Sequence, residues 1–344
     1  QKMNKIRIKT RYKKLLADTI TPVGIYLQIR DRYNNTILLE SSDYHGNENS
    51  YSYICCEPMA TFSLINDEVH QSLPGEPTSV KKLEKKDNIM DELRQFGNSF
   101  EEEKIDFKFI TNGLFGYIQY DGVSFFEDIQ INNPQPSSTP LIHYAVYKNM
   151  IVVDHFKNEL YIFEHYLEGD REQSGIPKIE MILNNKNIPS YSFSLDGKES
   201  SNYTDNEFLD ILAKGREHCF RGDVFQIVLS RSFSTGFKGD EFNVYRALRS
   251  INPSPYLFYF DYGSYKIFGS SPEAQIVVKG NKATIYPIAG TFKRTGNDKE
   301  DAELAVKLFD DPKENSEHVM LVDLARNDLS IIGTFFSIKT KRIT

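Results

Sequence analysis

The sequence has no tryptophan and only three cysteines among its 344 residues. Cys55 and Cys56 are adjacent and Cys219 lies far from both, so no CxxC pair is present. Three cysteines in this arrangement exclude a disulfide framework and a zinc site built from cysteines. We therefore expect a reduced, cytoplasmic protein.

Long hydrophobic runs are also absent. The longest apolar stretches have about six residues, far fewer than the roughly 20 that a membrane-spanning helix needs. The net charge is −7, from 41 basic and 48 acidic side chains. General nucleic-acid binding requires a basic surface, so we expect neither nucleic acid nor membrane as a partner.

Several common catalytic signatures are missing. The seven histidines are scattered without an HxxxH or HExxH pair, and there is neither a glycine-rich phosphate loop nor a nucleophile elbow. Hydrophobic residues make up 40% of the chain and charged residues 26%, which is the composition of a globular protein.

Strand signals dominate the first half, at residues 6–9, 37–39, 110–120, 144–154 and 160–165. Residues 168–202 are polar and contain few apolar runs, so we place a domain boundary near residue 200 and predict domains at 1–200 and 201–344. Strands in the first half and interspersed helices in the second predict a mixed α+β fold with large sheets.

The second half contains clear signals for helix ends and turns. Thr204 and Glu207 are spaced as a capping box, and Gly222 stands where that helix would end. The run 224–229 predicts a strand interrupted by Gln226, and Gly280 with Asn281 predicts a hairpin turn. Two further helices are expected, one from residue 297 and one from residue 312.

The last of these helices carries two carboxylates on one face, because Glu314 and Glu317 are three residues apart. Apolar residues on its other faces predict that much of the helix is buried, and buried carboxylates need a cation, a metal or hydrogen bonds. Two carboxylates with oxygen ligands alone suit Mg²⁺. The alternative is a capping glutamate beside a salt bridge.

Three further positions could carry chemistry. Glu273 lies in a small-residue turn and could be a general acid if burial raised its pKa, or it could be an ordinary turn residue. The segment PIAGT (287–291) could bind an anion through its backbone N–H groups or form a plain tight turn. Gln226, if buried in its strand, either braces the core or lines a site.

Five segments occur in a fixed order: GDVFQIVLSR (222–231), NPSPY (252–256), GSSPE (269–273), PIAGT (287–291) and KENSEHVMLVDLARND (313–328). Together they resemble the chorismate-utilising enzymes, and most closely the anthranilate synthase large subunits. The strong likeness covers about residues 203–330. A weaker likeness, LLES (38–41) with SYS (50–52), covers the amino-terminal domain.

The resemblance implies a large α+β two-sheet sandwich with flanking helices and a site between the sheets. It also implies conversion of chorismate and ammonia to anthranilate and pyruvate with Mg²⁺, the ammonia coming from a glutamine amidotransferase small subunit. By the same resemblance, Glu317 is the Mg²⁺ ligand and Glu314 its neighbour. Glu273 protonates the departing hydroxyl group, and Gly290 and Thr291 hold the substrate.

Two positions distinguish the branches of this family. Relatives that make isochorismate or salicylate carry a lysine base where this chain has Gln226, and an amide cannot deprotonate water. Relatives that make aminodeoxychorismate commonly carry a nucleophilic lysine where this chain has Ala289, which has no nucleophile. This pair favours anthranilate, although some aminodeoxychorismate synthases share the pattern and remain the alternative.

The resemblance further implies feedback inhibition by L-tryptophan. The inhibitor site would use Glu40, Ser41, Pro255, Tyr256 and Leu257 and would act on the catalytic site from a second position. For each segment the plain alternative is a strand end or a proline-rich turn.

The family usually continues past the RNDL segment, and residues 330–344 do not resemble that continuation. We therefore expect the catalytic domain to be incomplete. The alternative to an active enzyme is an inactive chain that binds only tryptophan or the partner subunit.

Overall fold

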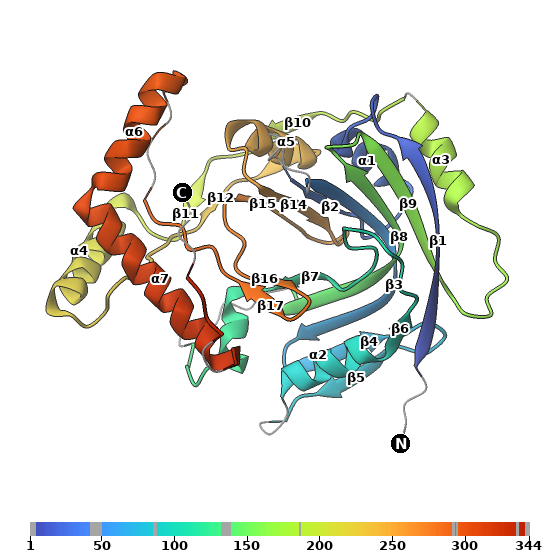
Figure 1. The fold of residues 1–344 in the computed structure, drawn as a ribbon, viewed down its shortest axis with the longest axis horizontal. Coiled ribbons are helices and arrows are strands. Elements are labelled where there is room, and N and C mark those ends of the chain that lie inside the picture. The colour runs from blue at the N-terminus through green and yellow to red at the C-terminus, as the bar shows by residue number, and fades with distance from the viewer. Residues whose placement is uncertain are drawn as a thin grey trace.

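The computed structural model describes residues 5–41, 50–84, 88–131, 139–185, 187–290, 293, 295–334 and 337–340. These residues form a mixed α+β structure with one large sheet and flanking helices (Figure 1), which confirms the predicted class. Within these ranges, no helix combines the length and the apolar character needed to cross a membrane.

The large sheet has eleven strands, eight of them in the order β15-β14-β2-β3-β8-β9-β1-β6. Those eight are β1 (Ile6–Leu16), β2 (Ile37–Glu40), β3 (Tyr51–Ile65), β6 (Phe100–Glu102), β8 (Ile142–Asp154), β9 (Glu159–Leu167), β14 (Tyr256–Asp261) and β15 (Lys266–Ser271). Three more strands join this path at its side: β4 (Glu68–Ser72), β5 (Ser79–Lys82) and β7 (Phe115–Ile118). The long strands predicted near residues 144–154 and 160–165 are thus confirmed as β8 and β9.

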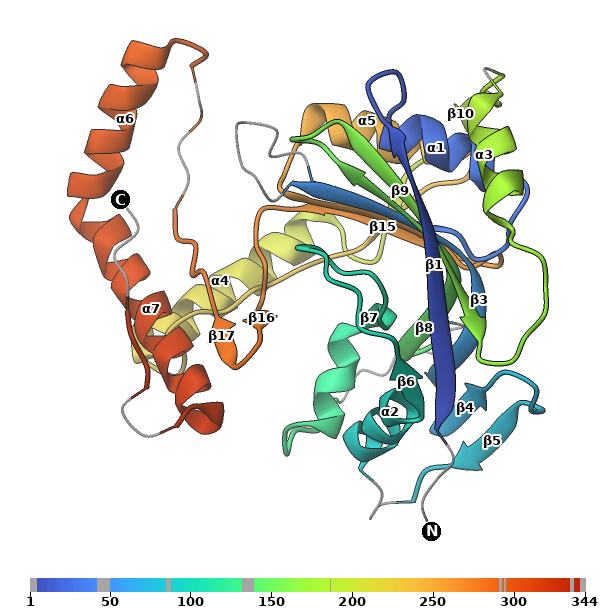
Figure 2. The ribbon, with the colours of Figure 1, turned by 45° about the vertical axis from the view of Figure 1, so that its right-hand side comes forward.

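Alternating side chains give this sheet two apolar faces. Leu38 and Ile54 belong to the core cluster on the face that carries α1 (Pro22–Ile29), α3 (Ile176–Asn184) and α5 (Phe242–Ile251). Figure 2 shows these three helices together on one side of the sheet. Ile37 and Cys55 point to the opposite face, where a second cluster includes Tyr147. The sequence alternation thus decides which side chains meet the helices.

The sheet extends past the predicted domain boundary. Strands β14 and β15 follow residue 200, yet β14 pairs antiparallel with β2 of the first half. Residues 256–271 therefore belong to the same sheet as the amino-terminal strands. The division near residue 200 stays a prediction about the chain as a whole.

The remaining elements are short or lie away from that sheet. They are α2 (Ile89–Asn98), the 3-10 helix η1 (Tyr120–Phe125), β10 (Phe193–Leu195), β11 (Ser200–Ser201), α4 (Asp205–Arg221), β12 (Phe233–Ser234), β13 (Phe237–Gly239), β16 (Val277–Lys279), β17 (Lys282–Thr284), α6 (Asp298–Asp310) and α7 (Pro312–Ile332). Figures 1 and 2 both show α6 and α7 on the far side of the β16–β17 hairpin from the large sheet.

The predicted helix boundaries are confirmed at atomic level. Thr204 and Glu207 form both halves of the capping box, and Gly222 ends α4 with a φ of 78°, in the left-handed region that favours glycine. Asn297 caps α6, and Asp311 caps α7 ahead of Pro312. Local hydrogen bonding at helix ends is therefore well encoded in the sequence.

Two predictions about burial are wrong for the described residues. No side chain of α7 is buried, so its carboxylates do not enter a closed core. Residues 224–229 are not a strand, because no described strand pairs with them, and Phe225 is 96% exposed. Without a partner strand the backbone of this segment forms no ladder of inter-strand hydrogen bonds among the described residues. Gln226 is exposed rather than buried.

Candidate functional site

The neighbouring strands β2 and β14 bring the residues of the predicted inhibitor site together. Glu40 and Leu257 are direct partners in the antiparallel ladder. Ser41 follows Glu40 along one strand, while Tyr256 and Pro255 precede Leu257 along the other. Two segments that are far apart in the sequence therefore meet at one corner of the sheet.

The Glu40 carboxylate at this corner is fully buried, with 0% of its side chain exposed. Its Oε2 accepts a hydrogen bond of 2.7 Å from the Tyr245 hydroxyl and one of 3.1 Å from Arg249 Nε. Its Oε1 has no hydrogen-bond partner in the part of the chain that the structure describes, and the same is true of the buried Ser50 Oγ. Buried polar atoms are normally satisfied, so these two oxygens indicate a place for donors.

A histidine adds to this polar corner. His155 Nε2 lies 2.7 Å from Ser52 Oγ, and the His155 backbone N–H donates to the carbonyl of Ser50. Burial lowers the pKa of His155, opposed by the carboxylate of Asp154 and reinforced by Arg249. The imidazole is therefore neutral at pH 7, so Arg249 remains the cation that faces Glu40.

Sequence reasoning missed Tyr245, Arg249 and His155. A signal for two of them exists, because Tyr245 and Arg249 are four residues apart on the helix that runs into NPSPY, and residues at that spacing share a helix face. The sequence could not reveal that Glu40 is their hydrogen-bond partner, since Glu40 lies on strand β2, more than 200 residues earlier.

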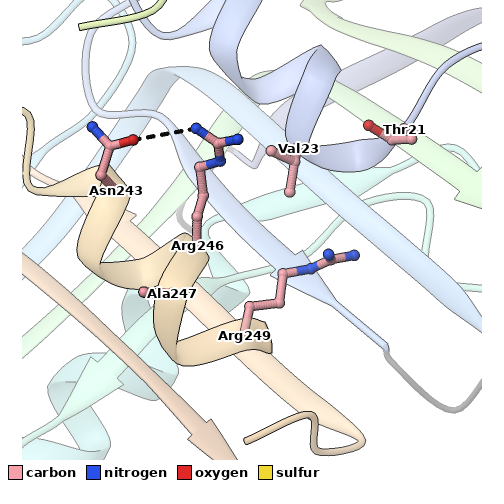
Figure 3. A pocket seen from close by; sticks show the side chains of 6 residues that line it. All are labelled: Thr21, Val23, Asn243, Arg246, Ala247 and Arg249. Carbon is pink, nitrogen blue, oxygen red and sulfur yellow. Dashed lines mark hydrogen bonds between the residues drawn. The ribbon is translucent and has the colours of Figure 1, made fainter. Parts of the chain in front are cut away.

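A surface cavity of about 480 Å³ opens between α1 and α5 beside this corner (Figure 3). Its lining residues are Thr21, Val23, Asn243, Arg246, Ala247 and Arg249. Arg246 donates to Asn243 Oδ1 at 3.2 Å, whereas Arg249 also reaches Glu40. None of the residues predicted for a site lines this cavity.

A second group of predicted residues meets where α7 begins. A Cβ atom placed on Gly290 would lie only 1.6 Å from Glu314 Oε2, so the carboxylate packs directly on the glycine backbone. That oxygen is buried and has no hydrogen-bond partner among the described residues. The backbone of Glu314 is itself fixed, because its N–H donates to Asp311 Oδ1 at 3.1 Å.

This arrangement fits a magnesium ion. Glu317, one turn further along α7, is half-buried like Glu314, and carboxylate oxygens are the ligands that Mg²⁺ prefers. The described residues contain no group of three or more His, Cys, Asp or Glu side chains arranged for a metal. Mg²⁺ commonly takes only one or two carboxylates from a protein and keeps other positions for substrate and water, so two carboxylates one turn apart are compatible with the predicted role.

The other predicted catalytic residues are less enclosed. Glu273 is exposed, and its backbone N–H donates to Ser271 Oγ at 3.2 Å in a tight turn after β15. Ala289 is half-buried beside Gly290, Gln226 is exposed, and Thr291 lies outside the described residues. Within the described ranges no hydrogen bond or ion pair joins Glu273 or Gln226 to Glu314, so their roles remain predictions.

Comparison with known proteins defines the class. Residues 35–343 match the family of chorismate binding enzymes. The chain belongs to this family, which agrees with the resemblance in the five ordered segments.

The relatives within the family are more specific. The chain is 32% identical over 343 residues to anthranilate synthase component 1 from Aquifex aeolicus, covering 96% of this chain and 68% of that protein. It is 31% identical to the component 1 of Lactococcus lactis subsp. lactis (strain IL1403), with 96% and 72% covered. The chain thus spans about two thirds of the length of these relatives.

Solved structures agree on the fold. Anthranilate synthase component I from Streptococcus pneumoniae TIGR4 matches with a TM-score of 0.65 and 26% identity, over 93% of this chain and 69% of that one. The menaquinone-specific isochorismate synthase from Escherichia coli matches with a TM-score of 0.59 at 12% identity, over 96% and 66%. The second likeness speaks for the fold alone.

Proposed function

We propose that this chain is an anthranilate synthase large subunit, which converts chorismate and ammonia to anthranilate, pyruvate and water. The observation that carries the proposal is the Glu314 carboxylate on Gly290, with a buried oxygen that lacks a partner in the described residues. The relatives named anthranilate synthase component 1 support the choice within the family.

In this proposal Glu317 and Glu314 hold Mg²⁺. The ion supplies positive charge for the ring carboxylate of chorismate and polarises it as a Lewis acid. The backbone at Gly290 and Thr291 binds that carboxylate through N–H groups, and Glu273 gives a proton to the departing hydroxyl group.

The nature of Gln226 and Ala289 supports ammonia as the nucleophile. An amide at position 226 cannot take a proton from water, and a methyl group at position 289 cannot attack the ring. The nucleophile therefore comes from outside this chain. A glutamine amidotransferase small subunit is the partner that we propose as its source.

The test is a product assay with chorismate, ammonium and Mg²⁺, in which anthranilate is followed by its fluorescence and pyruvate by reduction. Glu317→Gln should lower turnover at least about 100-fold, because a metal contributes several kcal/mol to stabilising charge. Glu303→Gln is the matched control, since Glu303 is an exposed glutamate on the neighbouring helix α6. Aminodeoxychorismate in place of anthranilate and pyruvate would contradict the proposed product.

We also propose that L-tryptophan inhibits the enzyme at the corner formed by Glu40, Ser41, Pro255, Tyr256 and Leu257. The meeting of β2 with β14 supports a single site, and a buried carboxylate with an available oxygen suits an ammonium group. Titration calorimetry with L-tryptophan tests it, and Glu40→Gln should weaken the affinity about tenfold. Unchanged affinity in that variant would contradict the assignment.

A further inference from the structure

We infer that Tyr245 and Arg249 are positioning residues, which hold the Glu40 carboxylate so that its Oε1 faces the ammonium group of an amino-acid ligand. The inference rests on the proposed tryptophan site and adds the helix α5 to it. It concerns how the ligand is recognised, since neither side chain is required to touch the ligand.

Both side chains occupy the same oxygen of the carboxylate. The Tyr245 hydroxyl donates to Oε2 at 2.7 Å, and Arg249 Nε donates to Oε2 at 3.1 Å. A carboxylate anchored twice through one oxygen cannot rotate freely, and its second oxygen then points in a fixed direction. That second oxygen is the buried Oε1 without a partner in the described ranges.

The tyrosine is itself held in place. Tyr245 is fully buried, and its ring lies 5.4 Å from the rings of Phe242 and Tyr259 and 6.3 Å from that of Phe268. Such close aromatic packing leaves the ring no alternative rotamer without opening the core. The hydroxyl therefore reaches Glu40 from a rigid position.

Arg249 provides charge as well as direction. It is one helical turn after Tyr245, so both reach the same strand end from one face of α5. The guanidinium balances the buried carboxylate, which would otherwise be unfavourable in this setting.

The corner then offers two acceptors for an ammonium group. Glu40 Oε1 and Ser50 Oγ are both buried and unpartnered within the described residues, and an ammonium group carries three donors. Helix α5 also leads directly into residues 252–257, which form the other wall of the proposed site. One element thus places Glu40 and, through the chain, Pro255 and Tyr256.

The experiment compares two ligands by titration calorimetry: L-tryptophan, and indole-3-propionate, which has the indole and the carboxylate but no ammonium group. The variants are Tyr245→Phe, Arg249→Gln and Arg249→Lys. Two controls are matched to them. Tyr259→Phe removes a buried hydroxyl from the same aromatic cluster, where it donates to Glu241, and Arg246→Gln removes a neighbouring guanidinium of α5 that pairs with Asn243.

We expect Tyr245→Phe and Arg249→Gln to weaken L-tryptophan about tenfold, the usual effect of losing a hydrogen bond to a charged group. Binding of indole-3-propionate should change less than about twofold, since it makes no use of Oε1. Arg249→Lys should recover part of the loss, and both controls should bind L-tryptophan as the unmodified chain does. A purely structural role would move both ligands together, and the matched loss of folding stability in Tyr259→Phe would then weaken binding as well.

Two results overturn the inference in different ways. If the unmodified chain binds L-tryptophan and the Tyr245 and Arg249 variants bind it equally well, or lose both ligands alike, the positioning role is wrong while the tryptophan site stands. If the unmodified chain binds no L-tryptophan, the proposed site is wrong and the positioning role with it.

Discussion

Replacement of Gly290 by alanine tests the contact on which the proposed magnesium site depends. The new Cβ atom would lie 1.6 Å from Glu314 Oε2, and ordinary van der Waals contact begins near 3.4 Å. The carboxylate must therefore withdraw by about 1.8 Å, because the helix that carries it is anchored by the Asp311 cap.

The size of the effect follows from that displacement. A misplacement of about 1 Å at a catalytic group can cost about 100-fold in rate, so Gly290→Ala should lower anthranilate formation at least 100-fold. The concentration of Mg²⁺ that gives half-maximal activity should rise at the same time, because one carboxylate leaves the ion. Folding should change little, since Gly290 lies in a segment that is not buried.

The assay is anthranilate fluorescence at a series of Mg²⁺ concentrations, with saturating chorismate and ammonium. Gly97→Ala is the matched control, because a Cβ there meets only a leucine methyl group at 3.6 Å, in ordinary contact. If Gly290→Ala keeps its activity and its Mg²⁺ dependence, the carboxylate of Glu314 does not act where we place it.

Three further predictions concern stability. Burial lowers the pKa of His165 from 6.5 to about 4, so the unfolded chain takes up this proton at a higher pH than the folded one. The free energy of unfolding should therefore fall as the pH falls from 7 to 4, by about 3 kcal/mol from this group. In His165→Gln, the free energy of unfolding measured by urea titration should depend less steeply on pH. Asp240→Ala should lower the free energy of unfolding by about 3 kcal/mol, because the buried guanidinium of Arg30 loses its partner at 2.6 Å. Asp323→Ala, which breaks an exposed ion pair, should lower it by less than about 1 kcal/mol in the same titration. Thr204→Ala should weaken α4 by about 1 kcal/mol through loss of its cap, and unchanged hydrogen exchange in 205–221 would contradict that.

Helix ends and the long strands of the large sheet can be predicted from the local sequence. Thr204 and Glu207 satisfy N–H groups of their own helix, and Asp311 does the same next to Pro312, so short-range chemistry is enough to predict them. Long apolar runs such as β8 are equally clear, since their alternation or continuous burial marks a sheet.

Burial in the second half could not be predicted in the same way. The apolar run 224–229 has the composition of a strand, but a strand also needs a neighbour, and composition does not reveal one. The same limit applies to α7. Its apolar residues favour burial, but the sequence does not show which element would cover them.

For the candidate sites as well, the sequence indicates some residues but not their contacts. The resemblance to a family placed Glu314, Gly290 and Glu40 on a site, and the structure gives two of them a direct contact. The partners of Glu40 come from α5 through pairing of β2 with β14, and such long-range contacts leave no mark in local spacing. A buried oxygen without a partner is likewise visible only in three dimensions.

The most direct test of the central claim is to supply the chain with chorismate, Mg²⁺ and ¹⁵N-labelled ammonium and to identify the products by mass spectrometry. The account predicts ¹⁵N-labelled anthranilate and pyruvate in equal amounts, and no product when chorismate is omitted. Labelled aminodeoxychorismate without pyruvate, or chorismate left unchanged, would contradict it.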